Sequence, residues 1–152
     1  PAEVLLDAIC QSTGVREHFN GWPGGYRAIE VWDNRMPSYF FRIFGRPVRA
    51  TVCECERSGE PSISQALHLL NSPEIMAKIQ HRDGTARRLA NSELTDDELI
   101  DELYLTTLSR FPNEEERNLM REAFSDSGSE RNEAVEDVLW ALLNTKEFIF
   151  NH

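Results

Sequence analysis

The spacing of apolar residues predicts helices along most of this chain. Two stretches carry apolar side chains three or four positions apart, which collects them on one helical face. In 130–144 this face comprises Ala134, Val135, Val138, Leu139, Leu142 and Leu143. In 96–109 it comprises Leu99, Ile100, Leu103, Tyr104 and Leu108. A shorter face, made of Val4, Leu5, Ala8 and Ile9, begins the chain and ends at Gly14. We expect these faces to point into the core.

Capping residues mark where several helices begin. A capping box, in which a polar cap is followed three positions later by Glu or Gln, occurs at Ser62/Gln65, Thr95/Glu98 and Asn113/Glu116. Ser72 is an N-cap followed by a first-turn proline and an acidic residue. The helices expected after residue 61 are about Ile63–Leu70, Pro73–Gln80, Thr85–Ala90, Asp96–Ser109, Glu114–Phe124 and Glu130–Asn144. Short connections such as 110–112 predict that successive helices are roughly antiparallel neighbours.

Two aromatic residues, Phe148 and Phe150, follow the last apolar stripe. Leaving both in water would be unfavourable. We therefore expect Phe148 to pack back onto the helices at 96–109 and 130–144.

The pattern changes before residue 62. The run 19–26, F-N-G-W-P-G-G-Y, contains three glycines and a proline and excludes regular structure. Tyr26–Trp32 and Val48–Glu54 could form two short strands that pair, with a short aromatic helix at Tyr39–Phe44 between them. The predicted fold class is mainly α: a compact helical domain with an irregular Gly/Pro-rich N-terminal third and at most a two-stranded ribbon. We expect one domain over 1–152, with 1–61 irregular, 62–152 helical, at least six helices and more than half of the residues helical.

Composition narrows the class of partner. The 152 residues fit one domain, and 26 acidic against 16 basic residues give a net charge of −10. A domain this negative, without a basic stripe, repels phosphate backbones, so we expect no nucleic acid partner. No apolar run reaches the length of a membrane span. Because the chain begins at Pro1 rather than Met, we expect it to be a fragment or a processed product of a longer protein.

The run 51–62, T-V-C-E-C-E-R-S-G-E-P-S, is the main candidate for chemistry. If it is extended, the Cα atoms of Cys53 and Cys55 lie about 6.6 Å apart, which would strain a disulfide between them. The two thiols could instead form half of a zinc site, with further ligands from histidines or carboxylates. The interpretation we favour is a structural strap in which Arg57 is held by carboxylates. The carboxylates available to it are Glu54, Glu56 and Glu60.

His68 and Asn71 form a second candidate, on the side of the 63–70 helix opposite its apolar residues. This side is polar but nearly uncharged. It could line a pocket, receive another domain, or simply face solvent. Elsewhere the chain contains no C-x-x-C-H haem attachment, no H-E-x-x-H zinc motif and no G-x-S-x-G nucleophile motif.

Four stretches, 3–9, 44–71, 102–116 and 137–152, together resemble the C-terminal part of a planctomycete-type domain of unknown function. That domain closes large secreted proteins whose upstream regions often include cytochrome c-like modules. The residues that match its signature are Cys53, Glu54, Cys55, Glu56, Arg57, Glu60, Pro61, His68, Asn71, Arg110, Glu147, Asn151 and His152. Gly59 departs from the pattern, and Asn20–Asn34 matches only loosely.

The resemblance implies the tail of an extracytoplasmic protein of several hundred residues, and it supplies no reaction. An oxidising compartment would favour a Cys53–Cys55 or a Cys10-containing disulfide. Any haem c would belong to upstream modules, so we expect no cofactor in this chain.

Three functions are compatible with the sequence, and whether the chain is an enzyme stays open. The leading hypothesis is a non-catalytic helical docking module that binds the missing upstream domains or a protein partner. The alternative is a redox or metal site on Cys53 and Cys55, with His68 as a weaker ligand candidate, that supports an electron-transfer or oxidative enzyme. A lower-ranked alternative is a part of a polysaccharide-degrading enzyme.

Overall fold

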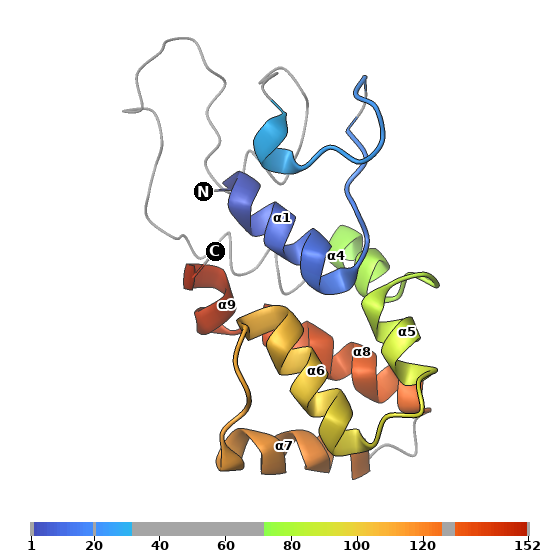
Figure 1. The fold of residues 1–152 in the computed structure, drawn as a ribbon, viewed down its shortest axis with the longest axis vertical. Coiled ribbons are helices and arrows are strands. Elements are labelled where there is room, and N and C mark those ends of the chain that lie inside the picture. Colours follow the sequence, from blue (N-terminus) through green and yellow to red (C-terminus); the bar gives the residue numbers. More distant parts are fainter. Residues whose placement is uncertain (1, 20, 32–71, 126–129, 152) are drawn as a thin grey trace.

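The computed structural model describes residues 2–19, 21–31, 72–125 and 130–151 (Figure 1). Within these residues 68% are helical and no strand is present. This confirms the mainly α fold class. The elements are α1 (Ala2–Thr13), the 3₁₀ turn η1 (Ala28–Glu30), α4 (Pro73–Ile79), α5 (Thr85–Ala90), α6 (Asp96–Leu108), α7 (Glu114–Ser125), α8 (Arg131–Leu143) and α9 (Lys146–Asn151).

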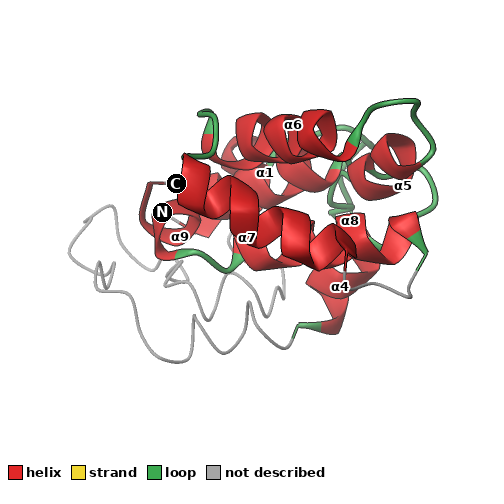
Figure 2. Ribbon diagram, turned by 90° about the horizontal axis from the view of Figure 1, so that it is seen from below, coloured by secondary structure: helices red, strands yellow, loops and turns green. Residues whose placement is uncertain are grey.

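The helix α8 lies at the centre of the packing and contacts α4, α5, α6, α7 and α9. All six apolar residues of its predicted stripe are buried. The stripe of α6 is buried from Leu99 to Tyr104, and Leu108 is half-buried. Burying one such side chain fully contributes about 1.5–3 kcal/mol, so these two faces account for much of the core. Seen from below, α7 lies across the outside of this bundle (Figure 2).

The first helix, α1, packs against α4, α5, α6 and η1. Its buried residues include Leu5, Leu6 and Ile9. Gly14 ends it with φ of +71°, the left-handed conformation that a helix terminus commonly needs. A Cβ at Gly14 would lie 2.8 Å from Thr85 Oγ1, so the close approach of α1 to the start of α5 also requires glycine.

The predicted helix starts in the described residues are confirmed, except that α8 begins at Arg131, one residue later than expected. Thr95 Oγ1 accepts from the Glu98 amide at 3.3 Å, and Glu98 Oε2 accepts from the Thr95 amide at 2.7 Å. The same reciprocal pair joins Asn113 and Glu116, at 2.9 and 2.8 Å. Ser72 caps α4 by accepting from the Ile75 amide. The Ser62/Gln65 box and the predicted helices at 39–44 and 63–70 lie outside the described residues.

The strand predicted at Tyr26–Trp32 is wrong for the residues that the structure describes, because 28–30 form the 3₁₀ turn η1. Asp7 explains the difference. Its Oδ1 accepts from the Ala28 amide at 2.6 Å and its Oδ2 from the Ile29 amide at 3.2 Å. These amides therefore bond a carboxylate of α1 and leave no ladder for a second strand. The proposed partner strand, Val48–Glu54, lies outside the described residues.

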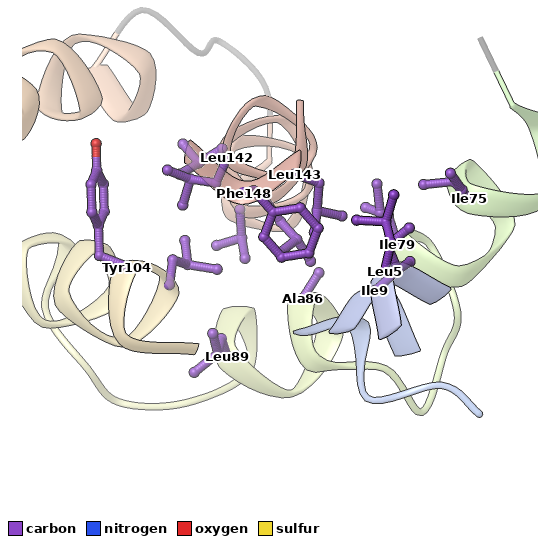
Figure 3. Packing of buried hydrophobic residues seen from close by; sticks show 14 of the residues in the cluster. Leu5, Ile9, Ile75, Ile79, Ala86, Leu89, Tyr104, Leu142, Leu143 and Phe148 are labelled. Carbon is purple, nitrogen blue, oxygen red and sulfur yellow. The ribbon is translucent and has the colours of Figure 1, made fainter. Parts of the chain in front are cut away.

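The C-terminal segment forms a further helix, α9, which the sequence pattern did not indicate. Phe148 is completely buried, in the cluster that α6 and α8 supply (Figure 3). The expected packing of Phe148 is therefore confirmed. Phe150, for which no packing was predicted, is 59% exposed.

Among the described residues, no helix has both the length and the apolar character that crossing a membrane would require.

Candidate functional site

The residues that the sequence singled out for chemistry are not placed by the structure. Cys53, Glu54, Cys55, Glu56, Arg57, His68 and Asn71 all lie outside the described residues. The strap, the redox pair and the zinc site therefore stay predictions. Two residues named by the family resemblance, Arg110 and Glu147, have described side chains, and the structure brings them together.

Arg110 joins three elements at one corner of the bundle. Its Nη1 and Nη2 donate to the two carboxylate oxygens of Glu116, at the start of α7, at 2.8 and 2.7 Å. Its Nε and Nη2 donate to the two oxygens of Glu147, in α9, at 2.8 and 2.7 Å. The guanidinium carbon lies 5.4 Å from the centre of the Tyr104 ring in α6. The loop after α6 is thereby tied to both α7 and α9.

The Arg110 cluster has a structural role. The fifth N–H of Arg110 donates to the carbonyl of Phe111, so all five guanidinium donors are in use. Hydrogen bonds from Arg110 lower the pKa of both Glu116 and Glu147, and both groups are therefore ionised at neutral pH. Burial raises the pKa of Tyr104, which stays protonated. Neither a free donor for a ligand nor a poised general acid is present in this cluster.

A pocket of about 430 Å³ lies beside the C-terminal half of α1. We call it the α1 pocket. One wall is α1, with Asp7, Cys10 and Gln11, and the other is the segment of residues 14–19 and 21–27, with residues that include Arg16, Glu17, Phe19 and Tyr26. Figure 1 shows this segment leaving the end of α1 and returning to η1, which contacts α1. Glycines at 14, 21 and 25 have positive φ and permit this tight return.

The thiol in this pocket is not an activated nucleophile. Cys10 is a free thiol, so a Cys10-containing disulfide is not formed in the structure. Burial raises the pKa of Cys10, and the opposing effect of nearby Lys78 is smaller. The Lys78 ammonium is itself bound by Glu17 Oε2 at 3.2 Å and by the Val15 carbonyl at 3.4 Å. A protonated thiol beside a lysine that already has two oxygen partners is suited to lining a pocket, because the thiolate is the reactive form.

The helix α7 carries an apolar strip that the fold covers only in part. The strip consists of Leu119, Met120, Ala123 and Phe124, which we call the α7 strip. This spacing places the four side chains on one side of the helix. Met120 and Phe124 are half-buried against the core, whereas Leu119 is 61% exposed and Ala123 is exposed. None of the twelve residues of α7 is buried.

Ion pairs hold α7 to α6. Arg117 Nη2 lies 2.6 Å from Asp101 Oδ1, and Arg121 bonds both oxygens of Asp97 at 2.7 and 2.8 Å. These pairs neutralise the arginines of α7. The exposed carboxylates of Glu114, Glu115 and Glu122 have no ion pair with any described residue. The surface around Leu119 is consequently apolar with an acidic surround.

The described residues contain no group of three His, Cys, Asp or Glu side chains that could hold a metal ion. The zinc candidates Cys53 and Cys55 fall outside the part searched, so this finding does not test them.

Residues 25–124 match the model of the PSD1 family, which is described as a protein of unknown function (DUF1553). The match spans well over half of the chain, and the chain therefore belongs to this family. The expected domain of unknown function is confirmed at that level. No curated protein and no solved structure matches the chain.

Sequence reasoning missed the α1 pocket and the α7 strip. The strip had a readable signal, because Leu119, Met120, Ala123 and Phe124 recur at helical spacing among charged residues. The sequence gives no comparable signal for the α1 pocket, because Asp7 and the backbone amides of residues 28 and 29 are brought into contact only by the fold.

Proposed function

We propose that this chain is a non-catalytic helical module that binds a protein partner through the α7 strip. The observation that carries the proposal is that α7 has the spacing of an amphipathic helix but no buried residue. Its outermost apolar side chain, Leu119, is flanked by Glu115 and Glu122, one helical turn away on either side. Most helices of this length bury their apolar face. A single exposed leucine is ordinary, but Leu119 belongs to an apolar strip of four residues.

The charge around the strip defines the partner. An apolar groove edged by Lys or Arg would cover Leu119 and Ala123 and pair with Glu114, Glu115 and Glu122. Such a groove would lie on another part of the same polypeptide or on a separate chain. The extracytoplasmic location and the upstream cytochrome c-like modules belong to this proposal as well, and they rest on the family resemblance.

The chemistry of the described residues supports a binding role rather than a catalytic one. The carboxylates of Asp97, Asp101, Glu116 and Glu147 are engaged by arginines. The thiol of Cys10 is protonated at neutral pH, for the reason given above. A role for Cys53 and Cys55 would be additional to this surface.

Photo-crosslinking tests the proposal. A photoreactive amino acid is placed at position 119 of the intact protein in the cells that produce it, and at Ile29, which is 56% exposed on another element, as the matched control. We expect a discrete protein adduct from position 119 that excess purified chain competes away. Competition by the Leu119→Glu chain should be weaker by about tenfold or more, because a leucine contributes about 1.5–3 kcal/mol when buried.

The cross-linked peptides distinguish the two sources of the groove, since an intramolecular link joins two peptides of one chain and an intermolecular link joins peptides of two different chains. The proposal is wrong if position 119 gives no adduct, gives the same adducts as position 29, or is competed equally by both chains.

A further inference from the structure

Arg16 differs from most arginines in the described part of the chain. Its Nη1 donates to the Gly25 carbonyl at 2.6 Å, which fixes the direction of the side chain. It has no ion pair with any described residue. Arg110, Arg117 and Arg121, in contrast, each hold at least one carboxylate. Arg16 thus presents an oriented guanidinium to the α1 pocket, whose wall it forms.

The carboxylates of the α1 pocket do not compete for Arg16. Asp7 accepts from two backbone amides and lies 3.6 Å from Arg27 Nε. Glu17 pairs with Lys78 and accepts from the His18 amide. The two arginines of the pocket wall balance its two carboxylates in number, but Arg27 lies beside Asp7 and Glu17 is paired with Lys78. Arg16 is therefore the cation of this wall that has no carboxylate partner among the described residues.

The rest of the pocket is suited to an apolar body. Phe19 is buried in its wall, and Tyr26 stands at its side with its ring 5.1 Å from that of Trp22, edge to face. The thiol of Cys10 is protonated and adds a further weakly polar surface. A volume of about 430 Å³ lies in the range of small-molecule sites in proteins.

We infer that the α1 pocket binds a small organic anion, a carboxylate on a planar apolar ring, with Arg16 as the anchor. The carboxylate accepts from the guanidinium edge that Gly25 leaves unused, and the ring lies against Phe19 and Tyr26. Gly25 positions this anchor, because a Cβ there would lie 3.2 Å from Arg16 Nη1 and its φ is +100°. This site is separate from the α7 strip and does not depend on the proposed docking function.

Benzoate is the probe, and the rate at which iodoacetamide alkylates Cys10 is the readout. Peptide mass spectrometry counts Cys10 separately from Cys53 and Cys55. We expect benzoate to protect Cys10 saturably in the 152-residue chain, with benzamide and acetate at least about tenfold weaker, because the first lacks the charge and the second lacks the ring.

Three variants test the anchor. Arg16→Gln should weaken the benzoate protection about tenfold or more, since a charge-assisted pair is lost. Gly25→Ala should weaken it in the same direction. Arg87→Gln is the matched control, because Arg87 is an exposed arginine on α5 that also lacks an ion pair with described residues, and it should bind as the unaltered chain does.

Several results would overturn the inference. These are the absence of saturable protection by benzoate up to its solubility, equal protection by benzamide or acetate, and unchanged binding by a folded Arg16→Gln chain. Circular dichroism of each variant establishes that it is folded, so a loss of binding by unfolding is recognised. A loss of binding in Arg87→Gln would also contradict the assignment to this pocket.

Discussion

At the scale of single residues, Phe148 and Phe150 form a matched pair two positions apart in α9. Phe148 is completely buried and Phe150 is 59% exposed. Phe148→Ala should lower the free energy of unfolding by about 3 kcal/mol or more, since it removes buried surface and leaves a cavity. Phe150→Ala should change it by less than about 0.5 kcal/mol. Denaturant unfolding of both variants measures the difference, and equal effects would show that the end of the chain is not anchored as described.

The Arg110 cluster predicts a pH dependence of stability. Hydrogen bonds from Arg110 lower the folded-state pKa of Glu116 and Glu147. Their contribution is therefore fully present above the unfolded carboxyl pKa of about 4.3, and it is lost as the pH falls through the lower folded values. Arg110→Gln should remove this contribution and place two carboxylates beside each other without a cation.

The expected loss for Arg110→Gln at pH 7 is about 1–2 kcal/mol, between the values for exposed and buried pairs, because all three side chains are about a third exposed. The variant should also lose less stability than the unaltered chain between pH 5 and pH 3, a window about the carboxyl pKa. Unfolding curves across this range provide the measurement. If the free energy of unfolding of both proteins changed by the same amount over this pH range, the role assigned to Arg110 would be contradicted.

At the scale of elements, α7 is attached differently from the helices around it. Its ion pairs with α6 are Arg117–Asp101 and Arg121–Asp97, and no residue of α7 is buried. The helix α8, by contrast, buries its whole apolar stripe. Because exposed ion pairs are screened by salt and buried apolar surface is not, α7 should open before α8.

Hydrogen exchange read by mass spectrometry tests this difference. The amides of α7 should exchange well before those of α8, and raising the salt concentration should accelerate α7 several-fold while leaving α8 unchanged. Exchange of both helices as one unit, without a salt effect, would show that α7 is an integral part of the core.

At the scale of the whole molecule, the helices were predictable because their signals are local. The stripe of α8 and the boxes at Thr95 and Asn113 depend on residues within one or two turns. The turn η1 was missed because its amides bond Asp7, 21 residues away. Arg110 and Glu147 are 37 residues apart, and their contact follows only from the fold. The helix α9 is too short for its spacing to stand out.

The candidate site was predictable only in part. Arg110 and Glu147 were named through the family resemblance, and the structure shows them as a clamp rather than a reactive centre. The α7 strip could have been found from the spacing of its residues. Whether these residues are exposed depends on how α7 packs against α6 and α8. The cysteine run at 51–62 stays a prediction, since it lies outside the described residues.

Coverage of the α7 strip by a protein partner can be measured directly by hydroxyl-radical footprinting. Met120 in the strip and Met76 in α4 are both half-buried methionines packed against the core, so their oxidation rates can be compared within one sample. In the intact protein in its own cells, relative to the purified 152-residue chain, oxidation of Met120 should fall several-fold while that of Met76 is unchanged. Equal rates for Met120 in both samples would contradict the claim that α7 is a docking surface.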